Sequence, residues 1–138
     1  MEAGYEVLGV GRRSCDAIES HTRGQFFQAD LTDPTAVEAI PLLPATSGPT
    51  ILINNAGTIG PIASTAEVGH EELAHCMQLN VVAPMRLTAR FLQEVKGEKQ
   101  VYFTGSGAAN YPIEGWAAYC ASKAAVHQYA EVVAKEHP

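Results

Sequence analysis

The sequence predicts an α/β protein built on a parallel sheet that helices cover on both faces, and three observations lead to that expectation. Short runs rich in β-forming residues alternate with segments of helical periodicity along the 138 residues. The run at 50–53 is apolar throughout, as expected for a strand of a parallel sheet buried on both faces. Apolar residues make up 46% of the chain and charged residues 17%, a composition typical of globular domains. The length suits one domain over residues 1–138.

The expected elements follow in order along the chain. Strands are expected at 5–10, 25–29, 50–53 and 100–104. Asp33 followed by Pro34 indicates a helix N-cap, and Pro41 requires that helix to be short. Residues 71–95 show helical periodicity that Pro84 should bend or divide, and 117–136 should form the closing helix.

Charge and cysteine usage narrow the classes of partner. The net charge is −6 and the nine lysines and arginines are scattered, which argues against nucleic acid and against an anionic membrane surface. No apolar run approaches the length of a membrane span. Three cysteines without a C-x-x-C pair, and five histidines without zinc-like spacing, favour a cytoplasmic protein with reduced cysteines and no metal.

The segment Gly9-Val10-Gly11 imitates part of a dinucleotide-binding fingerprint. The full pattern needs a third glycine three positions after the second, where helix and strand pack closely. Ser14 occupies that position, so the segment is interpreted as a strand end.

Four other features are more specific. Asn54-Asn55-Ala56-Gly57 directly follows a buried strand, Asn80 lies in "QLNVVAP", and Ser106 lies thirteen residues before Tyr119. Tyr119 and Lys123 form a Y-x-x-x-K pattern, which is weak alone because chance supplies it often. In this order and register the features resemble the short-chain dehydrogenase/reductase family over nearly the whole chain. Within that family, G-W-x-x-Y-C-x-x-K-A-A at 115–125 is similar to sepiapterin and benzil reductases, which implies NADPH-dependent reduction of a ketone or dicarbonyl.

The resemblance implies cofactor-binding residues. Arg12 and Arg13 match the end of the family's second strand, where two guanidiniums and no carboxylate suit the 2′-phosphate of NADP(H) rather than NAD(H). The alternative is two solvated arginines near a strand end. Asp30 and Leu31 match the pair that contacts adenine, although Asp30 could simply end a strand and begin a turn. Further positions implied to lie along the cofactor are Asn55, Ala56 and Gly57, with Tyr119 and Lys123.

The catalytic roles combine helical geometry with the resemblance. Residues four apart share a helix face, so Tyr119 and Lys123 can point into one cleft, where the ammonium favours the phenolate form. Tyr119 would then protonate a carbonyl oxygen that Ser106 also contacts, while Asn80 positions a relaying water by family analogy. Trp116 is interpreted as a substrate contact or as a packing residue at the helix entry. Without these partners, an exposed Tyr and Lys on an ordinary helix would be the simpler reading.

The resemblance also implies a doubly wound, Rossmann-like parallel sheet, and it implies that this α/β domain is partial. The family's first strand with its Gly-rich loop would precede Met1, and its C-terminal strands would follow Pro138. In the order 3-2-1-4-5-6 the first strand separates the second from the fourth, so a gap is expected between two halves of the sheet. We therefore expect a longer gene product, or closure of the gap by strand exchange or a homo-oligomer. A truncated, catalytically silent member that acts only in assembly or binding is the alternative function.

Overall fold

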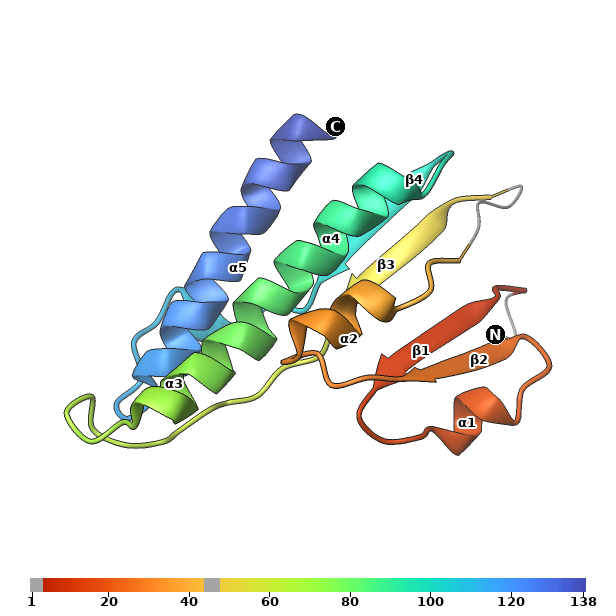
Figure 1. Cartoon of the computed structure of the whole chain (residues 1–138). Coiled ribbons are helices and arrows are strands. Elements are labelled where there is room, and N and C mark those ends of the chain that lie inside the picture. Colours follow the sequence, from red (N-terminus) through yellow and green to blue (C-terminus); the bar gives the residue numbers. More distant parts are fainter. Residues whose placement is uncertain (1–3, 44–47) are drawn as a thin grey trace.

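The computed structural model describes residues 4–43 and 48–138, and its strands form two parallel pairs (Figure 1). β1 (Val7–Gly11) pairs with β2 (Gly24–Gln28), and β3 (Thr50–Asn54) pairs with β4 (Lys99–Phe103). The four strands point the same way, so their carboxyl ends lie toward one edge of the molecule (Figure 1). The four expected strands are confirmed to within two residues at each end.

Five α-helices accompany these strands within the described residues. They are α1 (Asp16–Glu19), α2 (Pro34–Ala39), α3 (His70–Met77), α4 (Ala83–Glu94) and α5 (Ala117–Glu136). The helix predicted from Asp33 is confirmed as α2, because the Asp33 carboxylate accepts a hydrogen bond from the backbone of Thr35 at 2.8 Å. Helices α2, α4 and α5 lie side by side along the strands (Figure 1).

Helix α1 was not expected from the sequence, and it explains one of the glycines considered there. A Cβ added at Gly9 would lie 2.5 Å from Cδ1 of Ile18, which belongs to α1. Gly9 therefore lets α1 pack closely on β1, which agrees with interpreting this segment as a strand rather than a nucleotide fingerprint.

The expected long helix at 71–95 is divided, and its junction is a π-helical turn from Gln78 to Val82. In this turn the backbone N–H of Ala83 donates to the carbonyl of Gln78, five residues earlier. Pro84 has no N–H to donate to the carbonyl of Asn80, four residues before it. The predicted break is thus confirmed, and it lies around Asn80.

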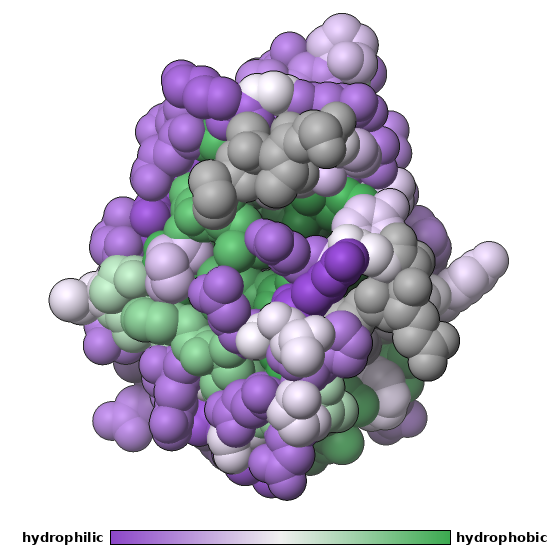
Figure 2. All heavy atoms as spheres, turned by 90° about the vertical axis from the view of Figure 1, so that its right-hand side faces the viewer, coloured by the Kyte–Doolittle hydropathy of each residue, from purple (hydrophilic) through white to green (hydrophobic). Residues whose placement is uncertain are grey.

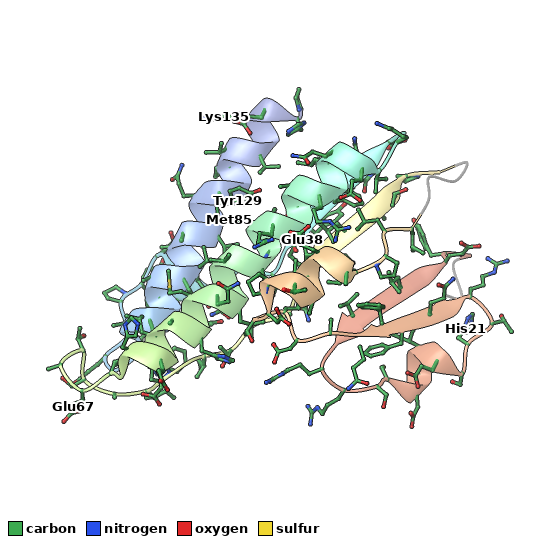
Figure 3. The ribbon with its side chains drawn as sticks, viewed as in Figure 1. His21, Glu38, Glu67, Met85, Tyr129 and Lys135 are labelled. Atoms are coloured by element: carbon green, nitrogen blue, oxygen red, sulfur yellow. The ribbon has the colours of Figure 1, made fainter. Side chains whose placement is uncertain are left out.

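Two ion pairs and a hydrogen bond tie the helices together. Arg86 of α4 pairs with Glu38 of α2, while Arg90 contacts the same carboxylate at 3.6 Å. Tyr129 of α5 lies beside Met85 of α4, and its hydroxyl donates to the Met85 carbonyl at 3.4 Å (Figure 3). Burial, with Glu136 nearby, raises the pKa of Tyr129.

A hydrophobic cluster fills the space between α2 and the π-helical turn. Its buried members are Ala29, Leu31, Val37, Ile40, Leu79 and Ala83. The expected covering of the sheet on both faces is not met at β3 and β4. Ile53 and Tyr102, neighbours across that pair, are 66% and 53% exposed because no described element packs over them.

Strands β1 and β3 are not hydrogen-bonded to each other, and a groove of about 590 Å³ lies between them. Its walls include Val7, Leu8 and Val10 from β1 and Ile51 from β3, with Phe91 of α4. Figure 2 shows hydrophobic side chains in a hollow on the side of the molecule where these strands begin. The gap expected between the two halves of the sheet is therefore confirmed.

Candidate active site

The residues singled out in the sequence follow the ends of the four parallel strands. Arg12 follows β1, Asp30 follows β2, Asn55 follows β3 and Ser106 follows β4. Ligands of open parallel α/β sheets bind outside the carboxyl ends of the strands. This edge is therefore the candidate site.

Helix α5 contributes Tyr119 and Lys123 from its first two turns. The Nζ atom of Lys123 donates to the carbonyl of Thr104, just beyond β4, at 2.9 Å. The same nitrogen lies 5.7 Å from the centre of the Tyr119 ring, within the range of a cation–π contact. The ring of Trp116 meets that of Tyr119 edge to face at 5.8 Å. The predicted pair thus shares one side of α5, and Trp116 packs directly against it.

Ser106 and Lys123 both line a small cleft beyond the end of β4. The cleft has a volume of about 140 Å³, and Thr104 also lines it. The Ser106 hydroxyl oxygen accepts from the backbone of Ala108 at 3.2 Å, capping a short 3₁₀ turn at Gly107–Ala109. Its proton is not used by that bond, so Ser106 can donate to a ligand oxygen in the cleft.

The segment after β3 joins this cluster through two contacts. Thr104 donates from its hydroxyl to the side-chain oxygen of Asn55 at 2.8 Å, so Thr104 links Asn55 with Lys123. A Cβ added at Gly57 would lie 3.3 Å from Oδ1 of Asn80. Gly57 therefore allows the chain to pass close to Asn80, while Ala56 beside it is exposed.

Asn80 is buried, with 4% of its surface exposed, and its amide is fully engaged. Its oxygen accepts from the backbone N–H of Thr58 at 2.8 Å. Its nitrogen donates to the carbonyl of Thr58 at 2.7 Å and to the hydroxyl of Ser122 at 2.9 Å. The side chain of Asn80 consequently holds the loop after β3 against α5.

Asp30 forms a turn at the end of β2. Its carboxylate accepts from the backbone N–H and from the hydroxyl of Thr32, at 2.9 and 2.7 Å. These bonds, more than the nearby Arg12, lower the pKa of Asp30 and keep it ionised. This geometry fits the turn-forming interpretation raised from the sequence. Leu31 is buried in the hydrophobic cluster and also lines the groove.

Arg12 and Arg13 are exposed at the end of β1, and neither forms an ion pair within residues 4–43 and 48–138. Both guanidiniums are accessible to an anion. The arrangement suits a phosphate as well as it suits two solvated side chains, so the two interpretations of the sequence stand side by side.

Sequence reasoning missed three residues of this site. Thr104 bridges Asn55 and Lys123. Ser122 bridges Asn80 and Tyr119. Thr58 forms two hydrogen bonds with the amide of Asn80. Ser122 stands directly before Lys123 in Y-C-A-S-K, but a serine inside a helix carries no functional signal without its partner. Thr58 and Thr104 follow strand ends, which is a signal that could have marked them.

Neither a metal cluster nor a membrane span is found in the part of the chain that the structure describes. Histidine, cysteine and acidic side chains form no group of three suited to a metal ion there. No helix within those residues is long and apolar enough to cross a bilayer.

Comparison with known proteins places this geometry in a family. The family model described as short chain dehydrogenase matches residues 1–138. The benzil reductase ((S)-benzoin forming) of Bacillus subtilis is 37% identical over 139 residues, covering 94% of this chain and 56% of its own. The sepiapterin reductase of Xenopus laevis is 32% identical over 141 residues, covering 98% of this chain and 51% of its own. The crystal structure of a short-chain dehydrogenase/reductase from Burkholderia vietnamiensis superimposes with a TM-score of 0.85 at 32% identity, covering 96% of this chain and 66% of that one.

The chain belongs to the short-chain dehydrogenase/reductase family, a family of oxidoreductases that use nicotinamide cofactors. The resemblance read from the motifs, including the likeness to benzil and sepiapterin reductases, is confirmed. The chain spans about half the length of those two relatives. The incomplete, doubly wound parallel sheet is likewise confirmed.

Proposed function

We propose that this chain carries the catalytic residues of an NADP(H)-dependent oxidoreductase that reduces a ketone or dicarbonyl to an alcohol. The observation that carries the proposal is the placement of Lys123 between Thr104 and the ring of Tyr119, in a cleft that Ser106 also lines. Lys123 and Ser106 line that cleft, and Tyr119 adjoins it through its contact with Lys123.

The strand-end edge fits a nicotinamide cofactor. Asn55, Ala56 and Gly57 are exposed there, which leaves this segment accessible to a cofactor. Arg12 and Arg13 would hold the 2′-phosphate that distinguishes NADP(H) from NAD(H). The cofactor supplies the hydride when bound, and the protein supplies orientation and acid–base groups.

Tyr119 is the proposed proton donor to the carbonyl oxygen. Lys123 stabilises the negative charge left on the phenol oxygen, while Ser106 donates a hydrogen bond to the same substrate oxygen. The Asn80 carbonyl receives no hydrogen bond from Pro84. That carbonyl is a suitable acceptor for a water that relays protons toward Lys123.

The surroundings of Tyr119 favour an apolar, aromatic substrate. Trp116 packs on the phenol ring, and the loops beside it expose Ile62, Tyr111 and Ile113 at 62%, 71% and 41%. The backbone of Ala63 pairs with that of Gly115 at 3.1 Å, which brings these loops together. Two relatives are named as reductases of benzil and sepiapterin, both of which carry ring systems next to carbonyls. We propose an aryl ketone or aryl 1,2-dicarbonyl as the substrate class.

The test follows NADPH oxidation by absorbance with benzil as the substrate. Tyr119→Phe keeps the aromatic ring and removes only the phenol, so kcat should fall by about 10²- to 10⁴-fold, the usual contribution of a general acid. Cofactor affinity, measured by NADPH fluorescence, should stay within about twofold. Tyr102→Phe is the matched control, because that side chain is 53% exposed on β4 and does not line the cleft. A Tyr119→Phe variant with wild-type kcat would refute the assignment.

A second candidate is a catalytically silent protein that acts through assembly. The groove between β1 and β3 favours it, because strand edges with free backbone groups tend to pair with another chain. A homo-oligomer is the assembly that we propose, in the cytoplasm, whose reducing conditions suit cysteines that form no disulfide within the described residues. Absence of NADPH binding at millimolar cofactor would favour this candidate over the reductase.

A further inference from the structure

Ser122 is a buried hydroxyl in the second turn of α5 that the proposed chemistry does not use. Ser122 is fully buried. Its oxygen lies 2.8 Å from the carbonyl oxygen of Tyr119 and 2.9 Å from the amide nitrogen of Asn80. An amide nitrogen can only donate and a carbonyl can only accept. The hydroxyl therefore accepts from Asn80 and donates to the backbone of Tyr119, and its direction is fixed.

The same arrangement continues on the far side of Asn80. Its amide pairs with both the N–H and the C=O of Thr58, at 2.8 and 2.7 Å. An unbroken series of hydrogen bonds thus runs from Thr58, after β3, through Asn80 in the π-helical turn and Ser122, to the backbone of Tyr119. Asn80 and Ser122 are both buried, and hydrogen bonds in such surroundings are stronger than those exposed to water.

No described neighbour can replace Ser122 in this series. Cys76 is the nearest alternative for the Asn80 amide, with its sulfur at 3.6 Å, but thiols are weak acceptors. Burial raises the pKa of Cys76, so this sulfur stays a neutral thiol near neutral pH. Loss of the Ser122 hydroxyl would leave one Asn80 N–H without a good partner, which loosens the grip of Asn80 on Thr58.

We propose that Ser122 is a positioning residue that couples the loop at Thr58 to the turn of α5 bearing Tyr119. The loop follows Asn55, Ala56 and Gly57, so Ser122 aligns the cofactor side of the site with the proton donor. The catalytic part of this inference rests on the proposed reductase function. The coupling itself is a property of the fold and needs no substrate.

The coupling is tested by amide hydrogen exchange, measured by NMR on the 138-residue chain. Ser122→Ala should speed exchange of the Thr58 amide about tenfold, the effect of losing one buried hydrogen bond of ~1.4 kcal/mol. Thr88→Val is the matched control. Thr88 is fully buried and accepts from Asn54 at 3.1 Å, but it lies outside the series. The control should leave Thr58 exchange within about twofold of wild type.

The conservative variant separates positioning from packing. Ser122→Thr keeps the hydroxyl and adds a methyl group, so it should retain slow exchange at Thr58 even if the extra methyl lowers the melting temperature. In the reductase assay, Ser122→Ala should lower kcat about tenfold while KM for NADPH stays within about threefold, and Ser122→Thr should restore kcat.

Each outcome decides the proposal. Wild-type exchange at Thr58 in Ser122→Ala, with only a lowered melting temperature, would show that Ser122 merely packs. If Ser122→Ala fails to fold, the wild-type spectrum decides: nuclear Overhauser contacts between the Asn80 side-chain amide and the Ser122 β protons must be present, and their absence overturns the series. A wild-type chain without reductase activity would refute the proposed function alone, because exchange and proton contacts report no chemistry.

Discussion

Replacing the amide of Asn80 by a carboxyl, in Asn80→Asp, is the sharpest available test of the geometry around the site. The amide nitrogen donates to Thr58 and to Ser122, while the amide oxygen accepts from the backbone of Thr58. A carboxylate keeps the acceptor oxygen for the Thr58 N–H but has no hydrogen to donate to Thr58 or Ser122. At 4% exposure it would also be a nearly buried charge facing the Thr58 carbonyl.

The loss of stability caused by Asn80→Asp should depend on pH. Burial disfavours the charged form, so the new carboxyl should have a folded pKa above its unfolded value of about 3.9. Between those two values the folded state holds a proton that the unfolded state has released. The free energy of unfolding of the variant should therefore fall by about 1.4 kcal/mol for each pH unit, relative to wild type.

Two contributions add to the expected loss. One hydrogen bond is lost even when the carboxyl is protonated, at about 1 kcal/mol, so the variant should be about 1 kcal/mol less stable than wild type at pH 4. Two further pH units bring the loss to about 4 kcal/mol at pH 6. The pH-dependent part of this loss disappears as the pH falls toward the unfolded pKa, and only the loss of about 1 kcal/mol from the missing hydrogen bond remains.

Urea unfolding at pH 5, 6 and 7, followed by fluorescence of the sole tryptophan, Trp116, measures these differences. With a urea slope of about 1–3 kcal/mol per molar, each pH unit should shift the midpoint difference by about 0.5–1.4 M. Asn110→Asp is the control, because Asn110 is exposed and should change stability by less than about 0.5 kcal/mol. A difference between Asn80→Asp and wild type that stays constant from pH 5 to pH 7 would refute the buried geometry of Asn80.

Three further predictions concern other parts of the chain. Arg12→Asp should weaken NADPH about 10- to 100-fold in a fluorescence titration and NADH far less, since a charge-assisted hydrogen bond contributes about 1.5–3 kcal/mol; equal weakening would remove the phosphate assignment. Val37→Ala should lower the free energy of unfolding by about 2–3 kcal/mol because Val37 is fully buried. Val132→Ala, at a side chain that is 42% exposed, should lower it by under about 0.5 kcal/mol. Similar losses in the two variants would contradict the buried position of Val37. The hydrogen bonds that lower the pKa of Asp30 stabilise the fold at pH values above the unfolded pKa of this carboxyl, and that stabilisation is lost as the pH falls. In urea titrations, Asp30→Asn should therefore be less stable than wild type at pH 7 and indistinguishable from it near pH 2. A difference that does not depend on pH would contradict this sign.

Local signals were sufficient for most of the elements. The β-rich runs at 5–10 and 50–53 became β1 and β3, and Asp33 capped α2, because strand propensity and capping act within a few residues. The four-residue helix α1 was missed, because so short a segment has no detectable periodicity and is stabilised by the packing of Ile18 on β1. The π-helical turn was also invisible, since a five-residue hydrogen-bond step leaves no separate pattern in a helical sequence.

The candidate site was likewise predictable from the sequence only in part. The sequence by itself determined the family and the roles open to Tyr119 and Lys123, because residues four apart on a helix share a face whatever surrounds them. Only the tertiary structure decided that Lys123 is held by Thr104 and that Ser122 joins Asn80 to the backbone of Tyr119. Asn80 and Ser122 are 42 residues apart along the chain, and no local rule relates them. Their contact exists because the π-helical turn and α5 are packed together, which buries both side chains and leaves each the other's partner.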